Sequence, residues 1–358
     1  RLDGAERIIR RFRARLCNRV KQSGFADVRQ TDNAQFHICL QLLYLLTFSS
    51  VLYAIPHQFG TNSGFLVSQR LKLRHGIVGD AHAGDWHRQI SLLAEESVDT
   101  MRAAAPMDLP AGAFAENINT RGLALKTLPV GTLLKVGPAI LRVTQIGKEC
   151  HNDCVIKQQT GECIMPREGV FARVIAGGEI RVGDEVTLLP PPENPPLRAA
   201  VITLSDKGSR GEREDKSGPA IVQRLEAEGY EVVEQILLAD DAAALKTTLT
   251  RLADQRQLDL ILTTGGTGFG PRDVTPEATM AVATRLAPGI AEAIRAASLA
   301  ITPRAMLSRA VSVIRGKTLI VNLPGSPKAV CESMDVFLPQ MPHALGLLRG
   351  EVRDCARR

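Results

Sequence analysis

The chain has 358 residues, of which 44% are hydrophobic and 4% aromatic, so it is long enough to form two domains with cores of their own. Its formal charge of +6 is concentrated at the start, because residues 1–75 carry +8 and the remainder carries −2. The nearly neutral remainder argues against a nucleic-acid-binding protein. Seven unevenly spread cysteines exclude a disulfide framework and favour a reducing, cytoplasmic compartment.

Residues 1–58 form a basic and apolar extension. Within it, Phe36–Ile55 spans 20 residues, enough to cross a bilayer, and follows an Arg-rich segment as a signal anchor does. His37, Gln41 and a Thr/Ser group interrupt this stretch, and the flanking charges give no orientation. We therefore expect a buried or poorly folded extension, with a membrane tether through Phe36–Ile55 as the alternative.

Residues 59–189 predict a β-rich barrel or sandwich. Short apolar runs separated by Gly and Pro predict strands at 132–137, 139–147, 171–178 and 183–189. One helix is expected near residues 91–104.

The cysteines of this region allow three interpretations. Cys150, His151, Cys154 and Cys163 contain the residue types of a zinc site, but their spacing is irregular. The thiols could instead be packed in a core. The third possibility is a reactive thiolate at Cys150, because Lys148 and His151 are nearby cations that stabilise the form that acts as nucleophile and soft metal ligand.

The stretches "HGIVGDAHAGDWHRQISLL" and "TQIGKEC" resemble the MOSC domain, the molybdenum cofactor sulfurase C-terminal domain, over about residues 76–188. The resemblance implies a β-barrel with one cysteine tied to molybdenum binding or sulfur carriage. Asp80 and His82 match the same stretch, although a structural role for His82 is equally expected. The cofactor-site residues implied by the resemblance are Cys150, His87, Arg88, Glu116 and Asn117.

One segment departs from that family. "FGTNSGFLVSQRLKLRH", residues 59–75, does not match the strand and Lys-rich stretch with which MOSC domains usually open. The sequence therefore does not identify the first strand of the barrel or show how the barrel closes.

A Pro-rich linker follows at residues 190–197. Five of the seven residues from Pro190 onward are proline, which favours an extended spacer between two domains.

Residues 198–351 alternate between strand and helix patterns. Strands are predicted at 199–205, 230–238, 258–264 and 317–321, and helices at 217–229, 241–255, 276–286, 302–310 and 327–334. Ser217, Thr275 and Thr302 are the expected helix caps. The alternation predicts an α/β three-layer domain with a mainly parallel sheet.

Two glycine-rich loops lie where strands of this sheet end. They are "TTGGTGFGPRD", residues 263–273, and "NLPGSP", residues 322–327. Glycine lets backbone N–H groups turn toward an anion, and each loop leads into a helix N-terminus. The hydroxyl groups of Thr264, Thr267 and Ser326 are further donors. Two such loops suit a ligand with more than one phosphate.

Acidic residues beside these loops require a cation. Asp273 follows the first loop, and Asp240 follows another strand; a carboxylate next to a phosphate is repulsive unless an ion such as Mg²⁺ bridges them. In the alternative interpretation Asp273 only caps the helix that begins at Pro276. Asp241 competes with Asp240 as the candidate for a helix cap.

The two loops, together with "VITLSDKGSRGEREDKSGP", resemble the molybdopterin adenylyltransferase family (the MogA/MoaB type) over about residues 198–350. The resemblance implies a trimeric α/β protein that transfers AMP from ATP to molybdopterin with Mg²⁺ and releases pyrophosphate. Asp240 and Asp273 take the catalytic and metal-binding positions. The implied substrate-binding residues are Asp206, Ser209, Asp215, Ser217, Gly218, Thr264, Gly265, Gly266, Thr267, Gly268, Asn322, Pro324, Gly325 and Ser326.

Both resemblances lead to one pathway, so the sequence predicts a two-domain enzyme of molybdenum cofactor synthesis. The expected ligands are ATP, Mg²⁺ and molybdopterin or the molybdenum cofactor, and the expected partners are other cofactor-synthesis proteins or molybdoenzymes. The alternative is a non-catalytic protein that binds or inserts the cofactor.

Overall fold

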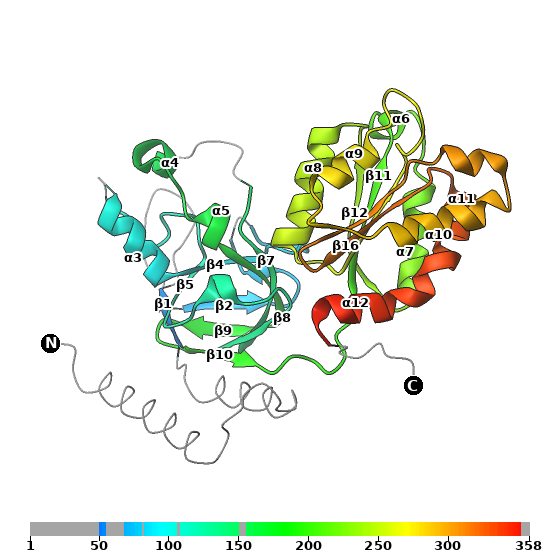
Figure 1. The fold of residues 1–358 in the computed structure, drawn as a ribbon. Coiled ribbons are helices and arrows are strands. Elements are labelled where there is room, and N and C mark those ends of the chain that lie inside the picture. The colour runs from blue at the N-terminus through cyan, green and yellow to red at the C-terminus, as the bar shows by residue number, and fades with distance from the viewer. Residues whose placement is uncertain (1–49, 55–67, 81, 106–107, 150–154, 352–358) are drawn as a thin grey trace, which may run out of the picture. The chain divides into compact units, whose positions relative to one another are not determined.

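The computed structural model describes residues 50–54, 68–80, 82–105, 108–149 and 155–351. These residues form two regions, a β-barrel up to Leu189 and an α/β domain from Arg198 onward (Figure 1). Of the stretch considered as a membrane tether, only Ser50–Ala54 is described. Within the described part of the chain, no helix is long and apolar enough to span a membrane.

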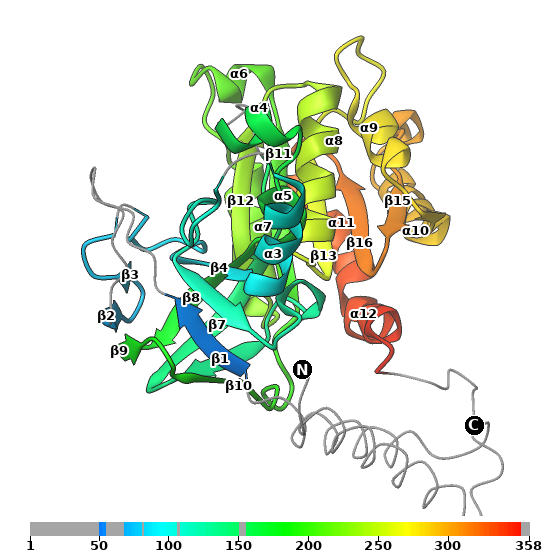
Figure 2. The ribbon, with the colours of Figure 1, turned by 90° about the vertical axis from the view of Figure 1, so that its left-hand side faces the viewer.

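Seven strands close the barrel in the order β1-β10-β6-β7-β8-β4-β5. Figure 2 shows β1, β7, β8 and β10 of this barrel. Their bounds are β1 Ser50–Ala54, β4 Ile90–Ala94, β5 Ile118–Arg121, β6 Leu133–Val136, β7 Ala139–Ile146, β8 Val170–Ala176 and β10 Glu185–Leu189. Strand β1 comes from the stretch that we assigned to the extension, and it pairs with both β10 and β5. The strand that closes the barrel therefore precedes the unmatched segment.

The remaining elements of this region are short. A small sheet has the order β3-β2-β9. The bounds are β2 Ser68–Lys72, β3 Gly76–Ile77, β9 Gly178–Arg181, α3 Glu95–Ala104, η1 Leu125–Thr127, α4 Val155–Thr160 and α5 Met165–Glu168.

Alternating side chains fill the barrel. Successive side chains of a strand point to opposite faces, so every second one points into the barrel. In β6 and β7 these inward residues, Leu134, Val136, Leu141 and Val143, are hydrophobic and fully buried. The helix that we expected near residues 91–104 begins only at Glu95. The residues before it are all buried in strand β4, which is paired on both sides, and a strand buried in this way lacks the polar alternation that marks an exposed one.

The α/β domain contains a six-stranded sheet in the order β12-β11-β13-β16-β15-β14. Strands β12, β11, β13 and β16 are parallel, and β15 and β14 are added antiparallel at one edge. The mainly parallel sheet is confirmed. The bounds are β11 Arg198–Leu204, β12 Glu231–Leu238, β13 Leu260–Thr264, β14 Arg285–Leu286, β15 Ser312–Arg315 and β16 Thr318–Leu323.

Helices cover both faces of this sheet (Figure 1). Helices α7, α10, α11 and α12 share one buried cluster with the strands, and α8 and α9 share another. The bounds are α6 Asp206–Ser209, α7 Ser217–Ala227, α8 Ala242–Thr250, η2 Arg251–Gln255, α9 Thr275–Ala281, α10 Pro288–Leu299, η3 Pro303–Leu307, α11 Pro327–Phe337, η4 Leu338–Gln340 and α12 Met341–Arg349.

Two predicted helices differ from the structure. The helix expected at 276–286 ends at Ala281, and Arg285–Leu286 pairs with β15 as the edge strand β14. The segment 302–310 contains only a 3₁₀ turn, η3, whose cap is Thr302 as expected. In the first case the segment pairs with β15, and in the second Arg309 N donates to the distant Thr267 carbonyl; local periodicity reveals neither contact.

Candidate active site

The two glycine-rich loops meet at the carboxyl edge of the sheet. Strands β13 and β16 are adjacent and parallel, so the loops that follow them start side by side. Thr264 Oγ1 donates to the Pro324 carbonyl at 2.6 Å, and Ser217 Oγ donates to the Gly325 carbonyl at 3.0 Å. These bonds fix the two loops to each other and to the start of α7.

Glycine is required at the turn of the first loop. Gly265 and Gly266 have φ values of +94° and +62°, which side chains other than glycine rarely adopt. A methyl group added to Gly265 would lie 2.4 Å from the Leu204 carbonyl oxygen, and one added to Gly266 would lie 2.4 Å from Thr275 Oγ1.

Thr275 does not cap α9, contrary to our expectation. The N-cap position is Val274, without a side-chain cap, and Thr275 Oγ1 donates to the Gly265 carbonyl at 2.9 Å. Asp273 does not cap the helix either, because its Oδ2 accepts from Gly270 N at 2.8 Å inside the loop. The carboxylate of Asp273 therefore belongs to the glycine loop.

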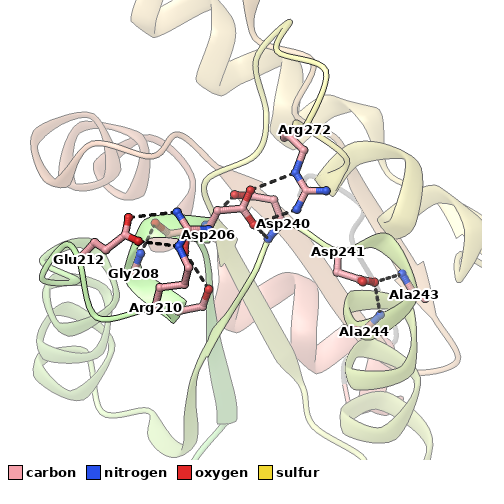
Figure 3. A network of polar contacts seen from close by, with 11 residues as sticks. Asp206, Gly208, Arg210, Glu212, Asp240, Asp241, Ala243, Ala244 and Arg272 are labelled. Atoms are coloured by element: carbon pink, nitrogen blue, oxygen red, sulfur yellow. Dashed lines mark hydrogen bonds and ion pairs between the residues drawn. The ribbon is translucent and has the colours of Figure 1, made fainter.

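Asp240 and Asp241 have different surroundings (Figure 3). Asp241 Oδ1 caps α8 by accepting from Ala243 N at 2.8 Å and Ala244 N at 2.9 Å. That leaves Asp240 beside the first loop, where its Oδ1 would lie 3.2 Å from a methyl group at Gly266. Asp240 and Asp273 thus both lie against the glycine turns.

A third carboxylate completes this edge. Asp206 N donates to Asp240 Oδ2 at 2.9 Å, and Asp240 N donates to Asp206 Oδ1 at 3.0 Å. The guanidinium of Arg272 binds both oxygens of Asp206, which lowers the pKa of Asp206. Burial raises the pKa of Asp240, and the negative charges of Asp206 and Asp273 raise it further. This electrostatic setting favours a bound cation.

The described residues contain no group of three or more His, Cys, Asp or Glu side chains placed to hold a metal ion by themselves. Mg²⁺ does not need such a cage, because it is usually bound through one or two carboxylates together with substrate phosphates and water. Asp240 and Asp273 beside a phosphate-type loop fit this mode of binding.

Arg309 is a residue of the site that the sequence did not indicate. Its Nε donates to the Gly268 carbonyl at 2.6 Å, its other nitrogens bind the Asp273 carbonyl and the Glu277 carboxylate, and its backbone N donates to the Thr267 carbonyl. The groups that it binds precede it by more than thirty residues. No local motif in the sequence marks Arg309. Its hydrogen bonds to the Thr267, Gly268 and Asp273 carbonyls hold the first loop in place.

Several residues that we predicted to bind substrate form hydrogen bonds with other residues of the protein. Asn322 is fully buried and donates to Thr263 Oγ1 and Thr279 Oγ1. The predicted cap Ser217 does not cap α7, because Asp215 Oδ1 accepts from the N–H groups of Ser217 and Gly218 instead.

The other predicted residues lie at the same edge of the sheet. A methyl group at Gly218 would lie 2.4 Å from Asp215 Oδ2, so glycine is needed for this close approach. Ser209 Oγ donates to the Asp206 carbonyl at 3.0 Å. Ser326 caps α11 by accepting from Ala329 N.

The barrel separates its predicted residues into two groups. Glu116 and Asn117 are buried: Glu116 accepts from Gly112 N, Phe114 N and Asn119 Nδ2, and Asn117 donates to Asp80 Oδ2 at 2.9 Å. These bonds order the segment before β5. Exposed His82 contacts Asp80 as well.

His87 and Arg88 form the second group. His87 Nε2 lies 3.0 Å from Gln145 Oε1, and burial is the main cause that lowers the pKa of His87 to about 4. The guanidinium of Arg88 stacks over Trp86 and Phe171, and its buried Nε has no hydrogen-bond partner among the described residues. Cys150, His151 and Cys154 lie outside the described residues, and Cys163 is half-buried.

Comparisons with known proteins assign both regions to families. Residues 200–343 match the family described as "Probable molybdopterin binding domain", and residues 79–187 match the MOSC domain. Molybdopterin adenylyltransferase of Helicobacter pylori (strain J99) is 39% identical over 156 residues, which are 43% of this chain and 89% of that protein. The protein of the same name from Escherichia coli (strain K12) is 44% identical over 142 residues, covering 39% of this chain and 72% of its own length. Among solved structures, the molybdopterin biosynthesis enzyme MoaB of Thermus thermophilus is 49% identical, covers 43% of this chain and 97% of that one, and has a TM-score of 0.42.

Proposed function

Because the chain belongs to the molybdopterin adenylyltransferase family through its C-terminal domain and carries a MOSC domain before it, we propose that it acts in molybdenum cofactor biosynthesis. The C-terminal domain transfers AMP from ATP to the terminal phosphate of molybdopterin and releases pyrophosphate. The observation that carries this proposal is the position of Asp240 and Asp273, both of which lie against the glycine turns.

The reaction needs alignment and charge neutralisation more than proton transfer, because a phosphate oxygen is already a competent nucleophile. The backbone N–H groups of the loop at Gly265–Gly268 bind phosphate oxygens of ATP. Asp240 and Asp273 hold Mg²⁺, which neutralises phosphate charge when it is bound. The second loop, at Pro324–Ser326, fixes the other phosphate-bearing substrate.

The MOSC domain binds the cofactor, its molybdenum or carried sulfur, with Cys150 as the reactive thiolate. Arg88 is the cation for an anionic group of the cofactor, since its buried Nε is without a partner in the described residues. With a pKa of about 4, His87 is neutral at pH 7 and acts as a hydrogen-bonding group rather than as a charge.

We further propose that the α/β domain forms a homo-oligomer, a trimer as its family resemblance implies. Large apolar side chains on β14, on η3 and in neighbouring segments are exposed in the single chain, which is typical of interfaces between subunits. They are Phe269, Leu286, Ile301, Met306 and Leu307.

The test is to incubate the full chain with ATP, Mg²⁺ and molybdopterin and to measure pyrophosphate release. Release that requires all three components is the expected result. Binding of molybdopterin without any release of pyrophosphate would contradict adenylylation and would favour a non-catalytic cofactor-binding or insertion protein.

A further inference from the structure

Two arginines flank the loop between Gly265 and Asp273, and they are held in different ways. The guanidinium of Arg309 is partly buried and binds three separate groups of the loop and of α9. The side chain of Arg272 is 64% exposed and, within the described part of the chain, its guanidinium binds Asp206. Arg309 is therefore held by three groups, whereas Arg272 is exposed to solvent and held by one carboxylate, so a second anion at the same edge can compete for its guanidinium.

The partner of Arg272 belongs to the acidic edge of the site. Asp206 exchanges two hydrogen bonds with Asp240, the residue that lies against the Gly266 turn. Arg272 binds Asp206 through both of its oxygens, at 3.0 Å from Nε and 2.9 Å from Nη2 (Figure 3). This guanidinium is thus a positive charge that offsets the negative charge of the carboxylate edge, since it lowers the pKa of Asp206 and acts in the same direction on Asp240.

We propose that Arg272 exchanges Asp206 for the phosphates of the nucleoside triphosphate when that ligand enters, and so releases the Asp206 carboxylate to the divalent cation. The inference rests on the proposed function and adds an order of events to it: the cation binds well only together with the nucleotide. Bidentate guanidinium binding suits phosphate as well as carboxylate, so the same side chain can serve both partners.

The exchange predicts effects of opposite sign for two ligands. Without Arg272, nothing competes with a cation for Asp206, but the nucleotide loses a charged donor. In the full-length Arg272→Gln variant, we expect the affinity for free Mn²⁺ to rise about 3- to 10-fold and the affinity for metal-free ATP to fall about 10-fold or more. Mn²⁺ binding is followed by electron paramagnetic resonance without nucleotide, and ATP binding by calorimetry in EDTA.

Two further variants sharpen the test. Arg272→Lys keeps a charge beside Asp206 and should return Mn²⁺ affinity toward that of the wild type, with only partial recovery of ATP binding because the fork is lost. Asp206→Asn keeps an oxygen acceptor for Asp240 N but frees Arg272, so metal-free ATP should bind more tightly than to the wild type. The matched control is Arg210→Gln, which removes an exposed arginine paired with Glu212 and should change neither affinity.

The outcomes distinguish this inference from the proposed function. If Arg272→Gln weakens both ligands or leaves both affinities unchanged while the wild type releases pyrophosphate, the exchange is wrong and adenylylation stands. A wild-type protein that binds neither ATP nor Mn²⁺ together with ATP would contradict the proposed function itself.

Discussion

Asp240 and Asp241 are neighbours in the chain, yet only one of them is engaged by a helix. Asp241 satisfies two N–H groups at the start of α8, whereas Asp240 faces Asp206 and the Gly266 turn. The helix cap therefore fixes the strand end in the orientation that directs the adjacent carboxylate toward the first glycine loop.

The raised pKa of Asp240 leads to a prediction about pH and stability. Because the charged form is disfavoured in the folded protein, stability falls as pH rises through the ordinary carboxyl pKa and remains lower at neutral pH. Asp240→Asn should therefore raise the melting temperature of the ligand-free protein at pH 7 and leave it nearly unchanged near pH 3. Thermal unfolding at both pH values measures this, and equal shifts at both would contradict it.

The lowered pKa of His87 also predicts how stability depends on pH. Its folded pKa of about 4 lies below the ordinary value of 6.5, so the unfolded chain binds a proton more readily. Stability should fall as pH drops from about 6.5 to about 4, by about 1–2 kcal/mol after allowance for partial exposure. Denaturant unfolding of the wild type and of His87→Gln should show this loss only in the wild type. The same pH slope in both proteins would contradict the assignment.

Among the secondary-structure elements, β13 and β16 position the site, because it lies where these strands end and where a hydrogen bond joins the loops that follow them. Arg309 lies in the segment before β15 and binds the carbonyls of Gly268 and Asp273. Arg309→Gln should leave these carbonyls without a charged donor, lower stability by about 1–3 kcal/mol and reduce pyrophosphate release at least about tenfold. Arg304→Gln, on the nearby turn η3, is the control. Full activity in Arg309→Gln would show that the loop holds its shape alone.

Local patterns predicted the parallel strands and both glycine loops, because the hydrophobicity, length and glycine content of a segment are local properties of the sequence. Local patterns failed where a side chain binds a group that lies far away in the sequence. The Thr275 hydroxyl is bound to the Gly265 carbonyl rather than capping α9, and Arg309 contacts groups more than thirty residues away. Strand β14 exists only through its pairing with β15. The barrel strand β1 likewise depends on partners far along the chain, as the paired residues Leu52–Thr120 and Ser50–Val186 are 68 and 136 positions apart.

For the molecule as a whole, the exposed apolar surface of the α/β domain predicts that copies of the chain associate with one another. Leu286 is 69% exposed on the edge strand β14. Leu286→Glu should shift sedimentation of the full chain from an oligomer toward the monomer by placing charge in an apolar interface. The control is Leu73→Glu, an equally apolar but separate exposed position in the barrel region. A wild type that sediments as a monomer, or a Leu286→Glu variant that sediments as the wild type does, would contradict this interface.

We propose that the carboxylates at the glycine loop, and not acidic residues in general, drive nucleotide transfer. The decisive measurement is the rate of pyrophosphate release from ATP, Mg²⁺ and molybdopterin by the Asp240→Asn, Asp273→Asn and Asp241→Asn variants. The first two should lose at least about 100-fold in rate. Asp241→Asn should stay near the wild type, because asparagine also caps helices well. Wild-type rates in Asp240→Asn and Asp273→Asn, or an equal loss in Asp241→Asn, would show that these two carboxylates do not drive the transfer.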